Sequence, residues 1–408
     1  MTPRLRTLAP FLLLGAAGCV DDLVLLVRED AARPMDRDAD GGTPDSGGDD
    51  AGPPLPIPDR RLAVGDRHGC AILAGGGLAC WGENDSGQLG VGETFAFTAA
   101  PQRVAPPDGW LAVAAYGETT CALRAEGALY CWGANSKGQL GVGDTADRSE
   151  PTLVPVRSVV DVDVGREFVC ALDVDRRLFC WGANFEGQLA QADPAASPDI
   201  PEPVQVGAER DWVTFSSGNG HGCGIRNRDQ LLCWGRNTQD QLGQGDGAAA
   251  QTRTPTPVAG AYVRVAAAQN HTCAIDVAGD LHCWGRNGDG QLGVGSGGRS
   301  EPTPVTGTDG DFDQVAASWF VTCAIRSGGV LACWGRNDDG ELFEDQRDRR
   351  EPTVMSALED WTEVRVGLFF FCARRATGET LCQGRNDLGQ LGRETAMTFD
   401  PALGPVDL

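Results

Sequence analysis

Residues 273–283 read Cys-Ala-Ile-Asp-Val-Ala-Gly-Asp-Leu-His-Cys, with two cysteines ten positions apart on either side of a glycine-containing turn. The same spacing recurs in seven copies at a period of about fifty residues, and it leaves only Cys19 without a partner at this spacing. Repeats of this length bury their apolar faces against their neighbours. We therefore expect a ring of repeats, each closed by a disulfide. The expected pairs are Cys70 with Cys80, Cys121 with Cys131, Cys170 with Cys180, Cys223 with Cys233, Cys273 with Cys283, Cys323 with Cys333, and Cys372 with Cys382.

The alternation of residues within each pair predicts a β-hairpin. In the first copy, Cys70 and Ile72 share one face of a strand, and Leu78 and Cys80 share one face of the next strand. Folding about Gly75 places the two cysteines opposite each other, within the roughly 4.5–5.5 Å of cross-strand partners. Short alternating runs between Gly, Asp and Asn, with no helical period, indicate an all-β unit. Each short disulfide loop is expected to contribute roughly 2–3 kcal/mol on chain-entropy grounds.

Two sets of aromatic residues recur at fixed distances from the cysteines. One set follows the second cysteine, where alternation points it away from the disulfide, and the other lies eleven positions before the first cysteine. We interpret both as core between neighbouring repeats, not as binding residues. The seventh copy departs from the pattern with Gln383 and Arg374, so the last repeat should pack differently. The two sets are Trp81, Trp132, Trp181, Trp234, Trp284 and Trp334, and Trp110, Trp212, Tyr262, Phe312 and Trp361.

The first residues have the order of an export signal. Residues 1–18 combine arginines, an apolar run broken by one proline, and Gly-Ala-Ala-Gly directly before Cys19. Small residues leading into a cysteine resemble a bacterial lipoprotein signal, so we predict that Cys19 is lipidated and anchors the chain to a membrane. The alternative is an ordinary cleaved signal that leaves Cys19 as an unpaired thiol. Export agrees with the paired cysteines, because disulfides persist outside the cytosol.

Composition divides the rest of the chain and limits its partners. Residues 19–57 are acidic and rich in Gly and Pro, which predicts a flexible tether before a folded domain at 58–408. The formal net charge of −23 repels nucleic acid, so we expect no nucleic-acid partner. Lys137 is the only lysine, which argues against covalent catalysis through a lysine amine.

Few residue patterns point to catalysis or metal binding. Three of the four histidines, His68, His221 and His271, occupy one slot two positions before a cysteine, so the repeat accounts for them better than catalysis does. Sequences such as Asn287-Gly-Asp-Gly superficially resemble calcium loops but lack the closing bidentate Glu, and tight turns explain them better. No nucleophile motif, phosphate loop or metal cluster is evident. We therefore predict a non-enzymatic protein without cofactor or metal.

One block resembles a known family. Cys131-Trp-Gly-Ala-Asn-Ser-Lys-Gly-Gln-Leu-Gly141 is similar to the signature of the regulator of chromosome condensation repeat, and versions of it recur in all seven copies over residues 58–408. The resemblance implies a seven-bladed β-propeller with four strands per repeat, and the cysteine spacing places one disulfide hairpin in each blade. The C-terminal segment from Asp400 to Val406 matches Glu-Pro-Thr-Pro-Val at 301–305. We therefore expect the last strand to complete the first blade and close the ring.

The resemblance also suggests functions. It implies guanine-nucleotide exchange on a small GTPase together with chromatin binding, but an exported, acidic chain meets neither. Some secreted propellers of this repeat type inhibit β-lactamases by clamping them on one face. We predict a lipid-anchored, protein-binding scaffold on the cell envelope, in the outer membrane, periplasm or cell surface, and a protein inhibitor is its sharper form. The protein partner is unknown and a monomer is expected. The alternatives are an envelope enzyme built from scattered carboxylates and a glycan-binding propeller.

A run of arginines suggests where a partner binds. The residue between the recurring Gly and Asn is Glu83, Ala134 and Ala183 in the first three copies and arginine in the last four. Equivalent positions on consecutive blades lie at one height, so these arginines predict a basic arc suited to an acidic loop or a carboxylate-bearing glycan. The alternative is that they bond local carbonyl groups. The candidate partner-binding residues are Arg236, Arg286, Arg336 and Arg385.

Overall fold

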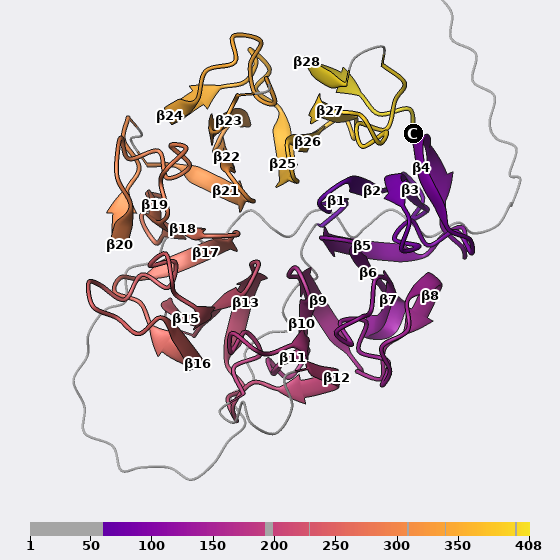
Figure 1. The fold of residues 1–408 in the computed structure, drawn as a ribbon, viewed down its shortest axis with the longest axis horizontal. Coiled ribbons are helices and arrows are strands. Elements are labelled where there is room, and N and C mark those ends of the chain that lie inside the picture. The colour runs from indigo at the N-terminus through magenta and orange to yellow at the C-terminus, as the bar shows by residue number, and fades with distance from the viewer. Residues whose placement is uncertain (1–59, 192–198, 228, 308–309, 339, 396–397) are drawn as a thin grey trace, which may run out of the picture. The chain divides into compact units, whose positions relative to one another are not determined.

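The computed structural model describes residues 60–191, 199–227, 229–307, 310–338, 340–395 and 398–408. The predicted export signal, the tether and Cys19 lie outside the described residues. Within them the chain forms seven four-stranded antiparallel sheets around a common centre, as Figure 1 shows. This confirms an all-β, seven-bladed propeller.

The four strands of each blade follow chain order from the centre to the rim (Figure 1). Blades 1 to 3 contain β1 (Leu62–Val64), β2 (His68–Ile72), β3 (Leu78–Asn84), β4 (Phe95–Arg103), β5 (Trp110–Tyr116), β6 (Thr119–Arg124), β7 (Ala128–Gly133), β8 (Arg148–Leu153), β9 (Val159–Val164), β10 (Phe168–Asp173), β11 (Leu178–Ala183) and β12 (Asp199–Gln205), with the 3-10 turn η1 (Ala125–Gly127) between β6 and β7. Blades 4 to 7 contain β13 (Trp212–Ser217), β14 (His221–Arg226), β15 (Gln230–Arg236), β16 (Gln251–Pro257), β17 (Tyr262–Ala267), β18 (His271–Asp276), β19 (Leu281–Gly285), β20 (Arg299–Pro304), β21 (Phe312–Ala317), β22 (Val321–Arg326), β23 (Val330–Gly335), β24 (Arg349–Val354), β25 (Trp361–Val366), β26 (Phe370–Arg375), β27 (Thr380–Arg385) and β28 (Phe399–Pro405).

The disulfide hairpins form in the predicted register. In the first blade Cys70 pairs with Cys80 and Ile72 with Leu78 across β2 and β3. Because each blade is held by a bridge between its two middle strands, the turns at either end of those strands are fixed to a rigid support. Seven disulfides also indicate an oxidising compartment.

All seven predicted disulfides are present, and each joins cysteines whose Cα atoms are 4.1 Å apart. The bridges join Cys70 to Cys80, Cys121 to Cys131, Cys170 to Cys180, Cys223 to Cys233, Cys273 to Cys283, Cys323 to Cys333, and Cys372 to Cys382. The local pairing expected from the ten-residue spacing is therefore confirmed in every blade.

The recurring tryptophans join neighbouring blades, as predicted. Trp132 of the second blade is fully buried in a cluster with Cys70 and Cys80 of the first blade. Its indole Nε1 donates to the carbonyl of Gln88 at 2.9 Å, also in the first blade. The same bond from the indole to the preceding blade recurs, so each tryptophan supplies both apolar area and a satisfied donor. The other donors are Trp81, Trp181, Trp234, Trp284 and Trp334.

In the seventh blade a glutamine takes the place of the recurring tryptophan. Gln383 is buried where the other blades carry tryptophan, and its amide donates to the carbonyl of Leu342 in the sixth blade at 2.6 Å. Arg374, which stands where the others carry Ile or Leu, donates to the carbonyl of Ile72 in the first blade at 3.3 Å. The last blade therefore packs differently, as expected, but keeps a polar bond to each neighbour.

The predicted ring closure is wrong. The C-terminal strand β28 pairs with β27 in the seventh blade, and β1 to β4 complete the first blade without it. The matching segment at 301–305 is likewise a rim strand of its own blade, because β20 pairs with β19. The first and seventh blades instead meet through packing and hydrogen bonds, including Trp81 Nε1 to the carbonyl of Gln390 at 2.9 Å.

The rim strands leave their outer edges unpaired, and proline protects them. Each of the seven rim strands contains at least one proline, such as Pro151 in β8 and Pro352 in β24. Proline lacks a backbone N–H and so disfavours pairing with a further strand. The rim is therefore poorly suited to binding another chain by strand addition, which directs attention to the two flat faces of the ring.

The repeated histidines are structural. His68 Nε2 lies 2.8 Å from Thr120 Oγ1 of the next blade, and that hydroxyl donates to the carbonyl of Gln88. His221 and His271 make the same contact with the threonines of their following blades. Burial lowers the pKa of the three imidazoles to about 4, 3 and 3, respectively, so they are neutral at pH 7. This agrees with the interpretation that these histidines have a structural role in the repeat and are not catalytic residues.

A charged cluster lies among the inner strands. The guanidinium of Arg60, just before β1, contacts Asp161 at 2.9 Å and Asp163 at 2.8 Å, both on β9 two blades away. Burial raises the pKa of Asp161 to about 6 although Arg60 opposes the shift. Buried carboxylates need such partners. The first and third blades are therefore tied together across the middle of the ring.

Candidate functional site

One face of the ring is built from equivalent turns. In every blade the turn between the first two strands and the end of the third strand lie at the same end of the sheet, because antiparallel strands alternate in direction. The backbone N–H at the third-strand end donates to the carbonyl of the last turn residue, as in Arg336 to Phe320 at 3.0 Å. We call this surface the turn face. Its residue pairs are Arg67 with Glu83, Glu118 with Ala134, Glu167 with Ala183, Gly220 with Arg236, Asn270 with Arg286, Phe320 with Arg336, and Phe369 with Arg385.

Three of the predicted arginines alternate with two phenylalanines on the turn face. The guanidinium carbon of Arg286 lies 5.6 Å from the ring centroid of Phe320, and that of Arg336 lies 5.5 Å from the same ring and 4.8 Å from Phe369. Arg385 lies 5.8 Å from Phe369. The two rings are stacked with centroids 6.2 Å apart. We call these five residues the arginine–phenylalanine stack, and guanidinium groups at such distances are attracted by the ring faces.

Trp319 extends the stack toward the other side of the ring. Its ring lies 6.1 Å from that of Phe320, and the Arg166 guanidinium of the third blade lies 5.2 Å from the indole. The indole Nε1 donates to Asp66 Oδ1 of the first blade at 3.1 Å. Burial raises the pKa of Asp66, while the bond from Trp319 opposes that shift. One tryptophan thus connects turns of the first, third and sixth blades.

Local acids and amides bind the four predicted arginines. Arg286 pairs with Asp289 at 3.2 Å and Arg336 with Asp338 at 3.2 Å, and Arg385 pairs with Asp387. Arg236 instead donates to the side chains of Thr238 and Asn270. Each of the four arginines thus has a local side-chain partner, where the alternative interpretation expected local carbonyl groups. Because the nearby aspartates offset the positive charge, the surface is an arginine and aromatic platform more than a basic arc.

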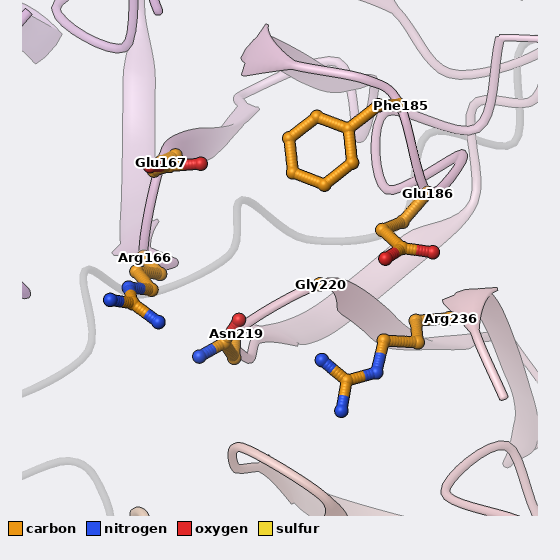
Figure 2. A pocket seen from close by; sticks show the side chains of 7 residues that line it. All are labelled: Arg166, Glu167, Phe185, Glu186, Asn219, Gly220 and Arg236. Carbon is orange, nitrogen blue, oxygen red and sulfur yellow. The ribbon is translucent and has the colours of Figure 1, made fainter. Parts of the chain in front are cut away.

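Arg236 belongs to a separate pocket. The pocket encloses about 310 Å³ between the third and fourth blades and is lined by Arg166, Glu167, Phe185, Glu186, Asn219, Gly220 and Arg236. Figure 2 shows Glu167, Phe185 and Glu186 along one side, and Arg166, Asn219 and Arg236 along the other. Phe185 is 50% exposed. Arg166 lines this pocket and also contacts Trp319, so the pocket and the stack belong to one continuous face.

The sequence identified the arginines but not the aromatic residues between them. Phe320 and Phe369 stand three positions before the first cysteine of their copies, where the other copies carry Arg67, Glu118, Glu167, Gly220 and Asn270. An aromatic residue at a turn position that is polar or glycine in the other copies was the signal available. Trp319 carries the same signal one position earlier. Their importance became visible only when the turns were placed side by side.

Two further features of the described residues bear on function. No group of three or more His, Cys, Asp or Glu side chains in the described ranges is arranged to hold a metal ion. None of the helical segments in those ranges has the length and apolar character needed to span a membrane.

Sequence comparison finds relatives that share part of this chain. The profile of the RCC1-like domain matches residues 50–368. The probable E3 ubiquitin-protein ligase HERC3 of Homo sapiens is 39% identical over 112 residues, which are 26% of this chain and 11% of that protein. The ultraviolet-B receptor UVR8 of Arabidopsis thaliana is 38% identical over 109 residues, 25% of this chain and 24% of the receptor. The matches thus span a quarter or less of these relatives.

Solved structures share the propeller. Human WBSCR16 superimposes with a TM-score of 0.72 at 20% identity, over 81% of this chain and 94% of that one. Prp20p from Saccharomyces cerevisiae, described with its binding to Gsp1p and histones, gives 0.72 at 19% identity, over 87% and 88% of the two chains. At such identities these structures support the fold alone. The profile match over most of the chain, on seven blades that carry the repeat signature, shows that the protein belongs to the RCC1-like domain family.

Proposed function

We propose that this chain is a non-enzymatic scaffold that binds a protein partner through the turn face of its propeller. The observation that carries the proposal is the arginine–phenylalanine stack. Phe320 and Phe369 are only half-buried, at turn positions where the other five blades carry polar residues or glycine. The repeat does not require them for folding. Arginine and aromatic side chains are also enriched at the centres of protein interfaces.

The arrangement of the stack also supports a protein ligand. Each of the three guanidinium groups lies over a phenylalanine ring and pairs with a nearby aspartate, so little side-chain freedom remains to be lost on binding. A rigid platform across the fifth, sixth and seventh blades suits a broad surface on a folded protein. A more specific version of this proposal is that the chain is a protein inhibitor that covers the active site of its target.

Capture from a native cell envelope tests the scaffold. The full chain, produced in an oxidising compartment, is coupled to a photo-crosslinker, because amine reagents have only Lys137 to modify. We expect one strongly enriched protein. Replacing Phe320 and Phe369 together by Asn, the residue of the fifth blade at this position, should remove it. Leu153→Asn on rim strand β8, where Leu153 is 56% exposed, is the matched control. Equal enrichment by the double variant would contradict the proposed surface.

We further propose that Cys19 carries a lipid that anchors the chain to the envelope. The small residues before Cys19 and the oxidising compartment indicated by seven disulfides support this. In cells, Cys19→Ala should move the protein from the membrane fraction to the soluble fraction. Mass spectrometry of the wild-type N-terminal peptide should show an acylated cysteine. An unmodified thiol at Cys19 would refute the anchor while leaving the scaffold proposal intact.

A further inference from the structure

Two residues that line the pocket at the third and fourth blades, Gly220 and Phe185, depart from the repeat. Gly220 is the only glycine among the seven last turn residues, and its φ lies outside the positive range, so backbone conformation does not demand glycine there. A Cβ at this position would lie 3.5 Å from Glu186 Cγ and 3.6 Å from Arg236 Cβ, inside the pocket. The missing side chain therefore opens the cavity.

Phe185 and Glu186 form the opposite side of the cavity, and Phe185 is equally unusual. Phe185 follows the recurring Asn184, where the other six copies carry Asp, Ser, Thr or Gly, and it leaves half of its surface exposed. Among the described residues, no salt bridge joins Glu167 or Glu186 to a cation, although Arg166 and Arg236 line the same pocket. Two carboxylates and two guanidinium groups thus line the same cavity, and the carboxylates form no salt bridge across it.

The distribution of charge limits the ligand. In Figure 2 the carboxylates flank the Phe185 ring on one side, while Arg166, Asn219 and Arg236 lie on the other. A ligand that covers both sides of the pocket must bring a cation to the glutamates and an anion to the arginines. Without such partners the buried charges would lose their hydration energy, and no new ion pair or hydrogen bond would offset the loss. A neutral sugar brings neither. The volume of about 310 Å³ is near the small end of ligand pockets and suits a single residue.

We propose that this pocket binds the C-terminal lysine or arginine of a peptide chain. The cationic head lies between Glu167 and Glu186, the aliphatic stem packs on Phe185, and the terminal carboxylate accepts from Arg166, Asn219 and Arg236. The competing ligand is an internal loop in which a basic residue stands next to an acidic one. Such a loop carries the same two charges on two residues, whereas a C-terminal lysine or arginine carries both on one. This inference deepens the proposed function, because the pocket would read the chain end of a partner that docks on the turn face.

Peptide titration tests the inference directly. The full chain is titrated by calorimetry with N-acetyl-Gly-Ala-Arg, its C-terminal amide, the citrulline analogue and N-acetyl-Gly-Arg-Asp-Gly-amide. We expect the free acid to bind, and the amide and the citrulline peptide each to bind about tenfold more weakly or worse, because each lacks one charge-assisted contact. The internal Arg-Asp peptide should bind more weakly than the free acid. Its equal or tighter binding would overturn the chain-end assignment, and equal affinity for all four would overturn the inference.

Protein variants locate the binding. Gly220→Phe places in the pocket the residue that two other blades carry at this position, so the fold is expected to be retained and peptide affinity to fall about tenfold or more. Ala134→Phe, on the turn face but outside the pocket lining, is its control. Glu167→Gln with Glu186→Gln should reduce the preference for arginine over citrulline, whereas Glu202→Gln on β12 should not. Unchanged binding in folded Gly220→Phe would refute the site.

The remaining outcomes separate this inference from the scaffold proposal. Absence of peptide binding at millimolar concentration by folded protein would overturn the pocket inference, and so would binding of a neutral oligosaccharide that Gly220→Phe abolishes. Envelope capture that depends on Phe320 and Phe369 would still uphold the scaffold. Conversely, peptide binding without any captured protein would uphold the pocket and refute the scaffold.

Discussion

The guanidinium carbon of Arg336 lies 4.8 Å from the ring centroid of Phe369, although the two residues belong to different blades. Arg336 directly follows β23, the third strand of the sixth blade, and Phe369 ends the first turn of the seventh. This contact converts two separate repeat positions into one surface. It also makes the third-strand arginines unequal, because three belong to the arginine–phenylalanine stack and Arg236 belongs to the pocket.

That division predicts two separable binding defects. Replacing Arg286, Arg336 and Arg385 together by Ser should reduce envelope capture about tenfold or more while leaving peptide affinity within about twofold, since these side chains lie outside the pocket lining. Arg236→Ser should reduce peptide affinity about tenfold and should reduce capture less than the triple variant does. Capture yield and peptide titration on the same two proteins provide the measurement. A common loss of both activities in both variants would mean that stack and pocket do not act separately.

Tryptophans of the two kinds should differ in their contribution to stability. Trp284 is fully buried between blades and donates to the carbonyl of Gln241 at 3.0 Å, so Trp284→Ala should lower the free energy of unfolding by about 3–5 kcal/mol. Trp319 is half-buried on the turn face, so Trp319→Ala should cost only about 1 kcal/mol, mainly from the lost bond to Asp66. Urea unfolding followed by circular dichroism compares them. Similar losses would contradict the assignment of Trp319 to a binding surface.

A single disulfide should stabilise the ring without being essential to it. Replacing Cys273 and Cys283 together by Ala opens one ten-residue link while six remain, and the free energy of unfolding should fall by about 2–3 kcal/mol. Cys19→Ala, outside the repeats, should leave it unchanged. Denaturant midpoints of the purified proteins are the readout. An unaltered midpoint in the double variant would show that the hairpin is already fixed without its bridge.

The buried histidines should make the fold sensitive to acid. Burial lowers the pKa of His271 from 6.5 to about 3, so below pH 6.5 the unfolded chain binds a proton that the folded chain resists, and stability is lost as the pH falls. At pH 5 this one residue should cost about 2 kcal/mol relative to pH 7. His271→Phe, the residue of the third and seventh blades in this slot, should shrink the difference between unfolding free energies at pH 7 and pH 5 by that amount. An undiminished difference would place the acid sensitivity elsewhere.

Local pattern was enough to predict much of the fold. The mirror of Cys70 with Cys80 and Ile72 with Leu78 depends only on strand alternation and a short turn, and the structure has that register. The burial of the tryptophans followed from the same alternation. The strand after Asp400 was assigned to the wrong blade, because sequence similarity between rim segments identifies a strand but not the sheet edge it joins.

The binding face was predictable only in part. The position of Arg236, Arg286, Arg336 and Arg385 at one height followed from the period, but their partners did not. Whether a guanidinium meets a phenyl ring, an aspartate or an open cavity depends on turns from neighbouring blades. Those turns are about fifty residues away in sequence, and no short motif spans that distance.

The sequence by itself determined the number of blades, the seven disulfides and the tryptophan seams, because each depends on spacings shorter than one repeat. Only the tertiary structure decided how the ring closes, where Phe320 and Phe369 enclose Arg336, and why Gly220 leaves a pocket. These features depend on the rotation from one blade to the next, which brings distant turns together. The repeat therefore specifies the scaffold, and its few departures, once placed side by side, specify the surface.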